Sequence, residues 1–455
     1  MNTTISDVVD STTAPSPLGT VLTGWGRFPR VPGSEDLSER LDQSTTDVPL
    51  TRGLGRAYGD AALPADGDLR VAGSALADRI LAFDEQTGDL TAEAGFALAD
   101  LYRVFLPRGF FTPVTPGTWF VTLGGMIASD IHGKNHHHAG TIGRHVRALK
   151  IRVADGRIVT CSRTNHADLF RATLGGMGLT GHILEVTLRL VRVPSPWIVS
   201  ETERIPDIGA FIEALKESGR NWPMTVGWID CLSRPPAMGR GVLFRGRWAD
   251  ATEAPTQFVA PRAPIPVPVT MPDWTLSPLV VRTFNMVNYR LHGRRVRRRV
   301  IHPTKFFYPL DSIGLWNRLY GKRGFAQYQC VLPDTAGHGA ARRFLELLTA
   351  RGGASFLCVI KDCGEQGEGL LSFPMSGISI ALDIPMRAGT QSLVDTLNEL
   401  VIREEGRIYL AKDAMTRPGH FRAMEPRLDE FLRVRRQWDP HGRIRSAQSV
   451  RLFGW

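Results

Sequence analysis

The chain has 455 residues, of which 43% are hydrophobic and 22% are charged, and its net charge is +10. This composition excludes a largely disordered chain and predicts a large buried core divided between two domains. No stretch has the roughly 18–20 apolar residues that a membrane span requires. The basic excess fits an anionic substrate, a membrane surface or nucleic acid, and equally the amino-acid bias of a GC-rich coding sequence.

The N-terminal residues, MNTTISDVVDSTTAPSPLG, contain neither the basic nor the apolar segment of a secretory signal. We expect a flexible leader over residues 1–18 and cytoplasmic residence. The five cysteines form no C-x-x-C pair, so they are expected to be reduced and structural. They are Cys161, Cys231, Cys330, Cys358 and Cys363.

Between residues 48 and 190, short strands alternate with glycine-rich turns, which indicates an α/β or α+β domain. Residues 89–95 and 182–193 are predicted strands. Residues 148–161 are predicted to form a hairpin that turns at Asp155-Gly156. Residues 97–107 have the spacing of a helix that ends at its proline.

From about Pro196 the pattern changes. Residues 254–278 are rich in proline and are predicted to form an extended or mobile loop, and six arginines follow between residues 289 and 302. Farther on, strands are predicted within 327–333, 355–361 and 378–385, and helices such as 337–352 separate them. This alternation favours an antiparallel sheet that is covered by helices.

Three glycine-rich loops are candidates for binding a ligand. Residues 176–181 fit G-x-G-x-x-G, but a helix precedes them and a strand follows, so the dinucleotide-binding context is reversed and a Rossmann site is excluded. Residues 52–60, R-G-L-G-R-A-Y-G-D, form either a nest of N–H groups for a pyrophosphate or an ordinary glycine turn. Residues 116–135 carry small residues that would let the backbone approach a flat or bulky group.

Four of the twelve histidines lie in S-D-I-H-G-K-N-H-H-H-A-G, residues 129–140. Zinc sites use spaced ligands, whereas three of these histidines are consecutive and must point in different directions. No Cys or carboxylate group supplies the remaining ligands. We therefore predict no metal site.

The loops together resemble the FAD domain of the vanillyl-alcohol-oxidase superfamily. The matching runs are residues 52–60, P-G-T-W-F-V-T-L-G-G-M-I-A-S-D-I-H-G-K-N-H-H and D-L-F-R-A-T-L-G-G-M-G-L-T-G. Among them, D-I-H-G-K-N-H-H resembles the decaprenylphosphoryl-β-D-ribose 2′-oxidases of actinobacteria. The resemblance continues through T-G-W-G-R, W-N-R-L-Y-G-K-R-G-F-A-Q-Y-Q, Y-L-A-K-D and M-E-P-R-L-D-E-F-L-R-V-R-R.

This resemblance implies an α+β fold, with a two-subdomain PCMH-type FAD-binding domain and an antiparallel-sheet cap domain covered by helices. The FAD-binding domain is expected at residues 19–195. The substrate or cap domain is expected at 196–406, with a mobile proline- and arginine-rich region at 254–302. Residues 407–455 are expected to return to the FAD domain.

The resemblance also implies which residues hold FAD. Some members of the superfamily attach the flavin through a histidine, but that place reads Arg56-Ala57-Tyr58 here, so we expect non-covalent FAD. The expected FAD-binding residues are Arg52, Gly53, Leu54, Gly55, Arg56, Ala57, Tyr58, Gly59 and Asp60 at the pyrophosphate; Gly117, Thr118, Thr122, Gly124, Gly125, Ser129, Ile131 and His132 along the flavin and ribityl chain; Ile183 near the adenine; and Tyr409 at the flavin.

The implied reaction is oxidation of the 2′-hydroxyl of a polyprenylphosphoryl ribose to a ketone, by hydride transfer to the flavin. It would be the first half of an epimerisation to the arabinose donor for cell-wall polysaccharide. Lys412 is predicted to be the cation that contacts the hydroxyl, with His132 beside it as a base or as a hydrogen-bond organiser. The expected substrate pocket comprises Lys134, Trp228, Gln327, Gln329, Lys361, Ser379 and Ala381.

The expected partners are the lipid-linked sugar, a short-chain reductase that completes the epimerisation and a quinone-like electron acceptor. The proline and arginine segments are expected either to contact anionic lipid headgroups or to form a solvated loop. Asn135, His136 and His137 are expected to brace the loop that carries His132.

Several residues differ from the pattern of the resembled family. Ala381 replaces a cysteine, and Phe307, Cys363 and Ser379 replace Tyr, Phe and Asn. A different sugar or polyol therefore stays open as the substrate. The alternative is an oxygen-using sugar, alditol or aldonolactone oxidase of the same superfamily, most of which carry the covalent histidine. A nucleic-acid-binding module would explain only the charge, because no nucleic-acid-binding motif accompanies the arginines.

Overall fold

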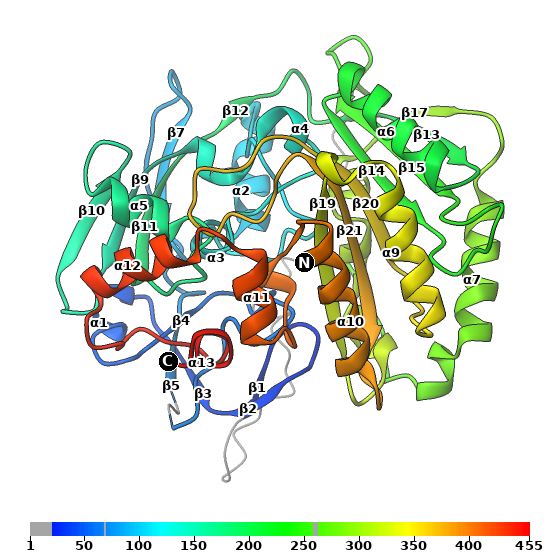
Figure 1. Ribbon diagram of the computed structural model, residues 1–455. Helices are drawn as coiled ribbons and strands as arrows, with labels where there is room; N and C mark the ends of the chain where they lie inside the picture. Colours follow the sequence, from blue (N-terminus) through cyan, green and yellow to red (C-terminus); the bar gives the residue numbers. More distant parts are fainter. Residues whose placement is uncertain (1–20, 68–69, 258–262) are drawn as a thin grey trace.

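The computed structural model describes residues 21–67, 70–257 and 263–455, so the leader predicted at 1–18 lies outside the described residues. Two parts lie side by side, each built on its own sheets (Figure 1). This mixture of helices with largely antiparallel sheets confirms the predicted α+β class. None of the described helices is both long and apolar enough to cross a membrane.

The first part, on the left of Figure 1, contains two sheets of more than two strands. A three-stranded parallel sheet has the order β3-β5-β4, and a five-stranded antiparallel sheet has the order β10-β9-β11-β7-β6. The strands are β3 (Ser34–Leu37), β4 (Thr51–Arg52), β5 (Arg70–Gly73), β6 (Ile80–Phe83), β7 (Asp89–Glu93), β9 (Val146–Arg152), β10 (Ile158–Ser162) and β11 (His182–Arg189). The helices are α1 (Leu41–Ser44), α2 (Leu98–Phe105), α3 (Leu123–Ala128), α4 (His136–Ala139) and α5 (Ala167–Thr173). Two short strand pairs complete it, β1 (Val21–Thr23) with β2 (Arg30–Pro32) and β8 (Phe110–Phe111) with β12 (Val191–Arg192).

Local sequence patterns account for several of these elements. The predicted hairpin is present, because Ile158 of β10 pairs with Arg152 of β9. From Leu184 onward, buried and half-buried residues alternate along β11, as expected of a half-buried strand. In α2, Leu98, Leu101 and Phe105 recur at helical spacing and are all buried.

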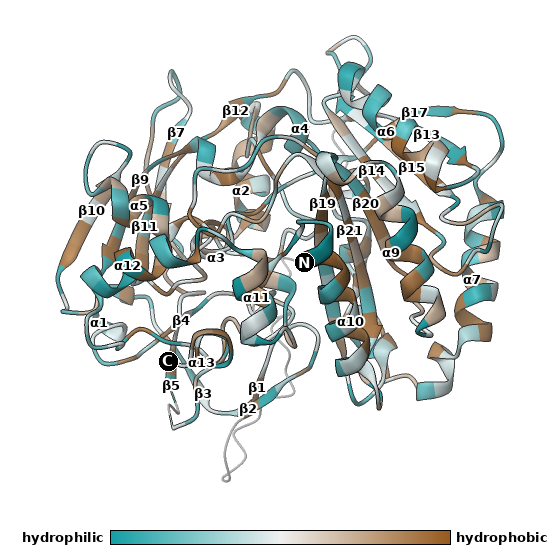
Figure 2. Ribbon diagram, in the orientation of Figure 1, coloured by the Kyte–Doolittle hydropathy of each residue, from teal (hydrophilic) through white to brown (hydrophobic). Residues whose placement is uncertain are grey.

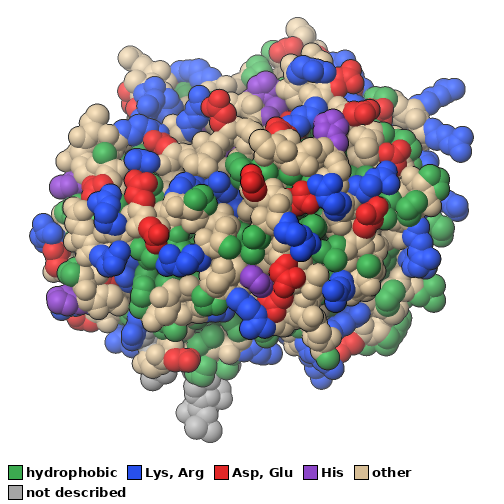
Figure 3. Space-filling model, in the orientation of Figure 1, with side chains coloured by type: hydrophobic (Ala, Val, Ile, Leu, Met, Phe, Trp, Pro, Cys, Tyr) green, Lys and Arg blue, Asp and Glu red, His purple; other side chains and the backbone are tan. Residues whose placement is uncertain are grey.

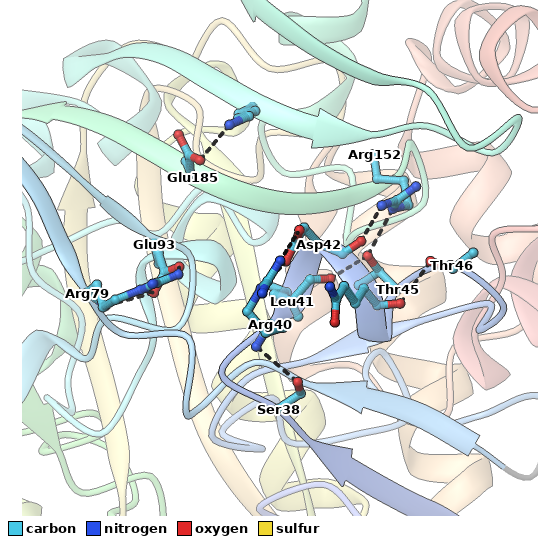
Figure 4. A network of polar contacts seen from close by, with 12 residues as sticks. Ser38, Arg40, Leu41, Asp42, Thr45, Thr46, Arg79, Glu93, Arg152 and Glu185 are labelled. Carbon is cyan, nitrogen blue, oxygen red and sulfur yellow. Dashed lines mark hydrogen bonds and ion pairs between the residues drawn. The ribbon is translucent and has the colours of Figure 1, made fainter.

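Hydrogen bonds and ion pairs link neighbouring elements at one edge of the first part (Figure 4). The guanidinium of Arg152 on β9 donates to the hydroxyl of Thr45, 3.2 Å away, and to the carbonyl of Asp42 in α1. Arg79 forms an ion pair with Glu93 on β7 at 2.5 Å. The two hydrogen bonds of Arg152 fix the short helix α1 against the five-stranded sheet.

The second part is an eight-stranded antiparallel sheet of order β17-β13-β15-β14-β20-β21-β19-β22. Figure 1 shows α6, α9 and α10 along it. The strands are β13 (Ile198–Ile205), β14 (Met224–Ile229), β15 (Gly241–Trp248), β17 (Arg297–Ile301), β19 (Phe325–Pro333), β20 (Cys358–Cys363), β21 (Gly377–Pro385) and β22 (Arg407–Ile408). The helices are α6 (Ile208–Asn221), α7 (Pro278–Leu291), α8 (Pro303–Phe307), α9 (Gly339–Ala350) and α10 (Thr390–Arg403). A short parallel pair, β16 (Ile265–Pro266) with β18 (Ile313–Gly314), lies outside this sheet.

The middle of this sheet is strongly apolar (Figure 2). Every residue of β19 is buried, as is every residue of β21 except Pro385. Burial on both faces follows from the helices on one side and the first part of the molecule on the other. The strand–helix alternation in the sequence predicted this covered sheet.

The C-terminal segment connects the two parts. After β22 pairs with β19, the chain continues through α11 (Pro418–Met424), α12 (Leu428–Trp438) and α13 (Ala447–Phe453). Helix α12 contacts α5 of the first part. Arg451 of α13 forms an ion pair with Asp60 at 2.7 Å.

The region from 254 to 302, which is expected to be mobile, contains a helix and a strand; residues 258–262 lie outside the described residues. Residues 278–291 form α7 and residues 297–301 form β17. Pro278 begins the helix rather than breaking it, because the first turn needs no donor from that residue. The arginines suit an exposed edge strand, and Arg298 forms an ion pair with Glu253 at 3.3 Å.

Candidate active site

A cavity of about 1200 Å³ lies between the two parts of the molecule. Residues 53–58 and much of the stretch 115–134 form the wall on one side. The other side is the face of the eight-stranded sheet that the helices α6 and α9 do not cover, together with α7 and β17. Its volume exceeds the ~300–1,000 Å³ that is usual for a small-molecule pocket.

The loop at residues 53–58 presents backbone donors. The N–H groups of residues 54–57 have no acceptor among the residues that the structure describes. Gly55 has a φ of 62°, which favours glycine and turns consecutive N–H groups the same way. Such a nest is suited to a pyrophosphate. The side chain of Arg56 stacks on the Trp25 ring, with its guanidinium carbon 4.3 Å from the centroid.

The second glycine-rich loop packs directly on the first. Thr122 caps α3, because its hydroxyl accepts from the N–H of Gly125 at 3.2 Å. A Cβ at Gly53 would lie 2.5 Å from that hydroxyl, so only glycine fits there. The sequence-predicted residues Gly117, Thr118, Thr122, Gly124, Gly125, Ser129, Ile131 and Ile183 all line the cavity.

Three residues of the predicted pyrophosphate loop do not line the cavity. Arg52 donates to the carbonyls of Thr23 and Ala62, at 2.8 and 3.1 Å. Asp60 accepts two hydrogen bonds from Arg451. Gly59 lies tightly against the backbone of residues 413–414. In this structure the contacts of Arg52, Gly59 and Asp60 hold the loop in place away from the cavity.

His132 lies at the centre of the cavity wall and is 6% exposed. Its Nε2 is 2.9 Å from Nε2 of Gln329, which also donates to the hydroxyl of Ser379 at 2.9 Å. Since the amide nitrogen donates both bonds, Nε2 of His132 accepts and the ring proton lies on Nδ1. Among the described residues, that Nδ1 has no partner. Burial, with Lys361 nearby, holds the pKa of His132 well below its usual value, so the ring is neutral.

Three lysines line the cavity near this histidine. Burial, followed by repulsion from Lys361, lowers the pKa of Lys412 to about 7 and that of Lys134 to about 7. Burial also lowers the pKa of Lys361. Lys134 donates to the carbonyl of Phe307 at 2.9 Å. No described acidic residue forms an ion pair with the other two, Lys361 and Lys412, so both present unneutralised amines to the cavity.

The other predicted substrate residues lie on the same sheet. Trp228, Gln327 and Ala381 line the cavity, whereas Gln329 and Ser379 lie just behind its wall. Ala381 pairs with Gln329 across β21 and β19. Tyr409 lines the cavity and donates to the carbonyl of Ser129 at 2.9 Å, which joins the C-terminal segment to the second loop.

The sequence reasoning missed a buried acid. Asp383 accepts from Gln327 at 2.5 Å and from the Tyr320 hydroxyl at 2.7 Å, and burial raises its pKa to about 6. Its charge favours the protonated form of Lys412. The sequence did contain a signal for this buried acid, because Asp383 is the one charged residue in the apolar strand I-S-I-A-L-D-I-P. Asp311, also missed, lines the cavity and accepts from the N–H of Trp119 at 2.8 Å.

The neighbouring polar residues brace the loop, as predicted. Asn135 donates to the carbonyl of Pro113 at 2.8 Å, and His136 accepts from the N–H of Gly364 at 3.0 Å. His137 lies 3.0 Å from the carbonyl of Trp222. Within the described part of the chain, no group of three or more His, Cys, Asp or Glu side chains has the arrangement of a metal site.

The residues present fit FAD. The nest at 54–57 supplies donors for a pyrophosphate, and the glycine-rich loop that follows leaves room for a flat ring. Nδ1 of His132, without a partner among the described residues, supplies a further polar contact.

Comparison with known proteins defines the class. Residues 35–162 match a family model described as an FAD binding domain. With the cavity and its glycine-rich loops, this makes the chain an FAD-binding oxidoreductase.

Full-length relatives define the family. The chain is 36% identical to decaprenylphosphoryl-β-D-ribose oxidase of Mycolicibacterium smegmatis over 89% of its own length and 88% of that protein. It therefore belongs to that protein's family, which confirms the resemblance seen in the sequence. An uncharacterized protein in the mprA 5′ region of Streptomyces coelicolor is 31% identical over 77% of this chain and 98% of that protein. Similarity to L-gulonolactone oxidase of Mus musculus, at 35% identity, covers only 25% of this chain and 26% of that protein.

Proposed function

We propose that the protein oxidises the 2′-hydroxyl of a polyprenylphosphoryl ribose to the 2′-keto sugar. One observation carries the proposal: amines of Lys412, Lys361 and Lys134 converge with His132 on a cavity that continues into the FAD-binding loops. Two of these amines, those of Lys361 and Lys134, would bind the phosphate as cations. The third, that of Lys412, would act on the hydroxyl. Likeness to the mycobacterial oxidase over 89% of the chain supports the same substrate class.

In this proposal Lys412 takes the proton of the hydroxyl. An amine with a pKa of about 7 is partly neutral at physiological pH and is therefore matched to proton transfer. After the transfer it is the cation predicted from the sequence. FAD, when bound, would supply the hydride acceptor, and residues 56–58, which include neither His nor Cys, would hold it non-covalently.

His132 acts as a hydrogen-bond donor rather than as a base. Its Nε2 is occupied by Gln329, so Nδ1–H is the group available to the cavity. Gln329 and Ser379 are then positioning residues that fix the ring. Neutrality of the ring keeps its donor capacity constant across the physiological range.

In this proposal residues 19–195 hold FAD and residues 196–406 cap the substrate. A 2-keto product requires a reductase to complete an epimerisation, and a quinone-like acceptor would reoxidise the flavin. The alternative, an oxygen-using sugar or aldonolactone oxidase, is favoured by short matches to lactone oxidases, such as that to L-gulonolactone oxidase.

We also propose peripheral contact with a membrane. Ten of the 19 exposed large hydrophobic side chains in the described ranges lie between residues 265 and 313, including Trp274, Leu279 and Leu291. Exposed arginines of β17 border them, and basic side chains project at the upper right of Figure 3, where Figure 1 has β17. Such a surface suits anionic lipid headgroups. Sedimentation with anionic vesicles at low salt, reversed by high salt, is expected; absence of binding at both salt concentrations contradicts the contact.

The experiment that tests the function is anaerobic flavin bleaching with two substrate panels. Polyprenylphosphoryl pentoses are expected to bleach the flavin and free alditols are not. Bleaching by alditols alone, with hydrogen peroxide formed in air, would favour the alternative.

A further inference from the structure

A continuous row of side chains crosses the cavity face of the eight-stranded sheet. At the edge, Arg297 on β17 pairs with Thr202 on β13, and Thr202 pairs with Phe244 on β15. Phe244 pairs with Val226 on β14. Two residues farther along β14, Trp228 pairs with Val359 on β20, which pairs with Ala381. All of these residues line the same cavity.

The row is much longer than a sugar phosphate. Four strand spacings separate β20, which carries Lys361, from β17, and at about 4.8 Å each they amount to about 19 Å. In a pentose 1-phosphate only three bonds separate C2 from phosphorus, at most about 4.5 Å. Lys361 lowers the pKa of both Lys412 and Lys134 by its charge and lines the same cavity, so the phosphate of a sugar whose C2 is at Lys412 is expected near Lys361 and Lys134. It cannot reach the arginines of β17.

The space between these two basic regions is lined mainly by apolar groups, with Thr202 of the row and Asn288 of α7 as polar exceptions. Val226, Trp228 and Phe244 form the sheet side, and Phe284 and Leu291 of α7 line the cavity as well. The indole N–H of Trp228 is already used, since it donates to the carbonyl of Phe356 at 2.9 Å. Trp228 thus presents a ring with no unmet hydrogen bond. A phosphate or a second sugar would find few partners here, whereas a hydrocarbon chain would bury its surface.

The cavity reaches the surface of the protein at β17. Arg295, Arg297 and Arg299 line the cavity and are nevertheless exposed. Arg297 and Arg299 point inward because alternate residues of a strand share a face. The exposed apolar side chains of α7 lie beside them in the sequence. A lipid that leaves here would pass directly to a membrane surface.

We propose that this row is the floor of a channel for the first part of the substrate's lipid, from the phosphate near Lys361 to the arginines of β17. The inference rests on the proposed function. An isoprene unit extends about 4–5 Å along the chain, so about 19 Å holds about four units. The remaining units leave the protein at β17. Chain length up to about four units is then a determinant of KM, and length beyond it is not.

The test is a chain-length series of polyprenylphosphoryl riboses with one to eight isoprene units, assayed by anaerobic flavin bleaching at one fixed detergent concentration. KM is expected to fall about tenfold or more per unit up to about four units and then to stay constant, with kcat nearly unchanged. A KM that does not change between one and four units overturns the channel. Absence of bleaching with every length overturns the proposed function itself.

Two variants locate the channel. Val226→Trp would close it one strand spacing from β20, and Thr202→Trp three spacings away. In Val226→Trp, KM is expected to stop falling after about one isoprene unit. In Thr202→Trp, it is expected to stop falling after about three units. Ile158→Trp, on the exposed β10 of the other part, is the matched control and should behave as the unmodified protein. If V226W changes KM equally for one-unit and four-unit substrates, the proposal is overturned. The FAD content and the thermal unfolding of each variant show whether it is folded.

Discussion

Replacing Arg451 by Met should destabilise the protein strongly, because this guanidinium joins the C-terminal helix α13 to two buried carboxylates. It donates to both oxygens of Asp60 at 2.7 and 2.8 Å, to Asp413 at 2.9 Å and to the carbonyl of Thr416 at 2.6 Å. Both carboxylate side chains are 5% exposed, and that of Arg451 is 22% exposed. Methionine keeps much of the apolar stem and removes every one of these donors.

The magnitude follows from the charges left behind. Removing one partner of a buried ion pair costs about 3–5 kcal/mol, because the other charge stays buried and unpaired. Arg451 serves two carboxylates, which raises the cost, while its partial exposure lets water replace part of the contact. We therefore expect a loss of about 3–4 kcal/mol in the free energy of unfolding.

The loss should depend on pH. Burial already raises the pKa of Asp60, whereas that of Asp413 is lowered in the presence of Arg451. Without Arg451 the pKa of Asp60 rises further and that of Asp413 rises above its unfolded value, so the folded variant binds more protons. Its stability then falls as pH rises, and the deficit is larger at pH 8 than at pH 5. Adding Asp60→Asn and Asp413→Asn to Arg451→Met removes the orphaned charges and should recover part of the loss.

Urea unfolding at pH 5 and pH 8 measures these values, with Arg433→Met, an exposed arginine of α12, as the control. Flavin release should occur at lower urea in Arg451→Met, since Asp60 ends the FAD-binding loop. If Arg451→Met and Arg433→Met unfold at the same urea concentration, the reasoning about buried charge is refuted.

Four further predictions concern the cavity and the flavin that it would hold. Lys412→Met should slow anaerobic flavin bleaching by about 10²–10⁴ without loss of bound FAD, and an unchanged rate would remove Lys412 from the chemistry. In the unmodified protein the bleaching rate at saturating substrate, where the bound phosphate keeps Lys134 protonated, should rise with pH through about 7, because only the neutral amine of Lys412 accepts a proton. Lys361→Met raises the pKa of Lys412, so this limb should move to higher pH, and an unmoved limb contradicts the coupling. Gln329→Met leaves His132 and Ser379 without their shared donor and should slow bleaching about ten- to hundredfold at normal FAD content, whereas a normal rate would show that ring position is unimportant. Acid denaturation should release the flavin into the supernatant, and flavin that stays with the protein would contradict non-covalent binding.

Local features of the fold were predictable from the sequence. The hairpin at 148–161 and the helix at 97–107 depend on neighbouring residues, through a turn at Asp155-Gly156 and the spacing of leucines. The glycine-rich loops were also recognisable, because the glycines of each loop lie close together in the sequence. Resemblance then connected loops that are far apart in the sequence.

Contacts between distant residues could not be predicted in the same way. Asp60 and Arg451 are 391 positions apart, so nothing near Asp60 shows that its carboxylate is already paired. Asp383 gains its significance from Gln327 and Tyr320, which only the folded sheet brings together. The arginines at 297–299 look like a solvated segment until pairing with β13 makes them an edge strand.

The central claim is tested most directly by a single anaerobic turnover with a polyprenylphosphoryl ribose of at least four isoprene units. The account predicts one equivalent of the 2′-keto sugar, identified by mass spectrometry after borodeuteride reduction, for each equivalent of flavin bleached. Bleaching without a ketone at C2′, or no bleaching by this substrate while free alditols bleach the flavin, would contradict it.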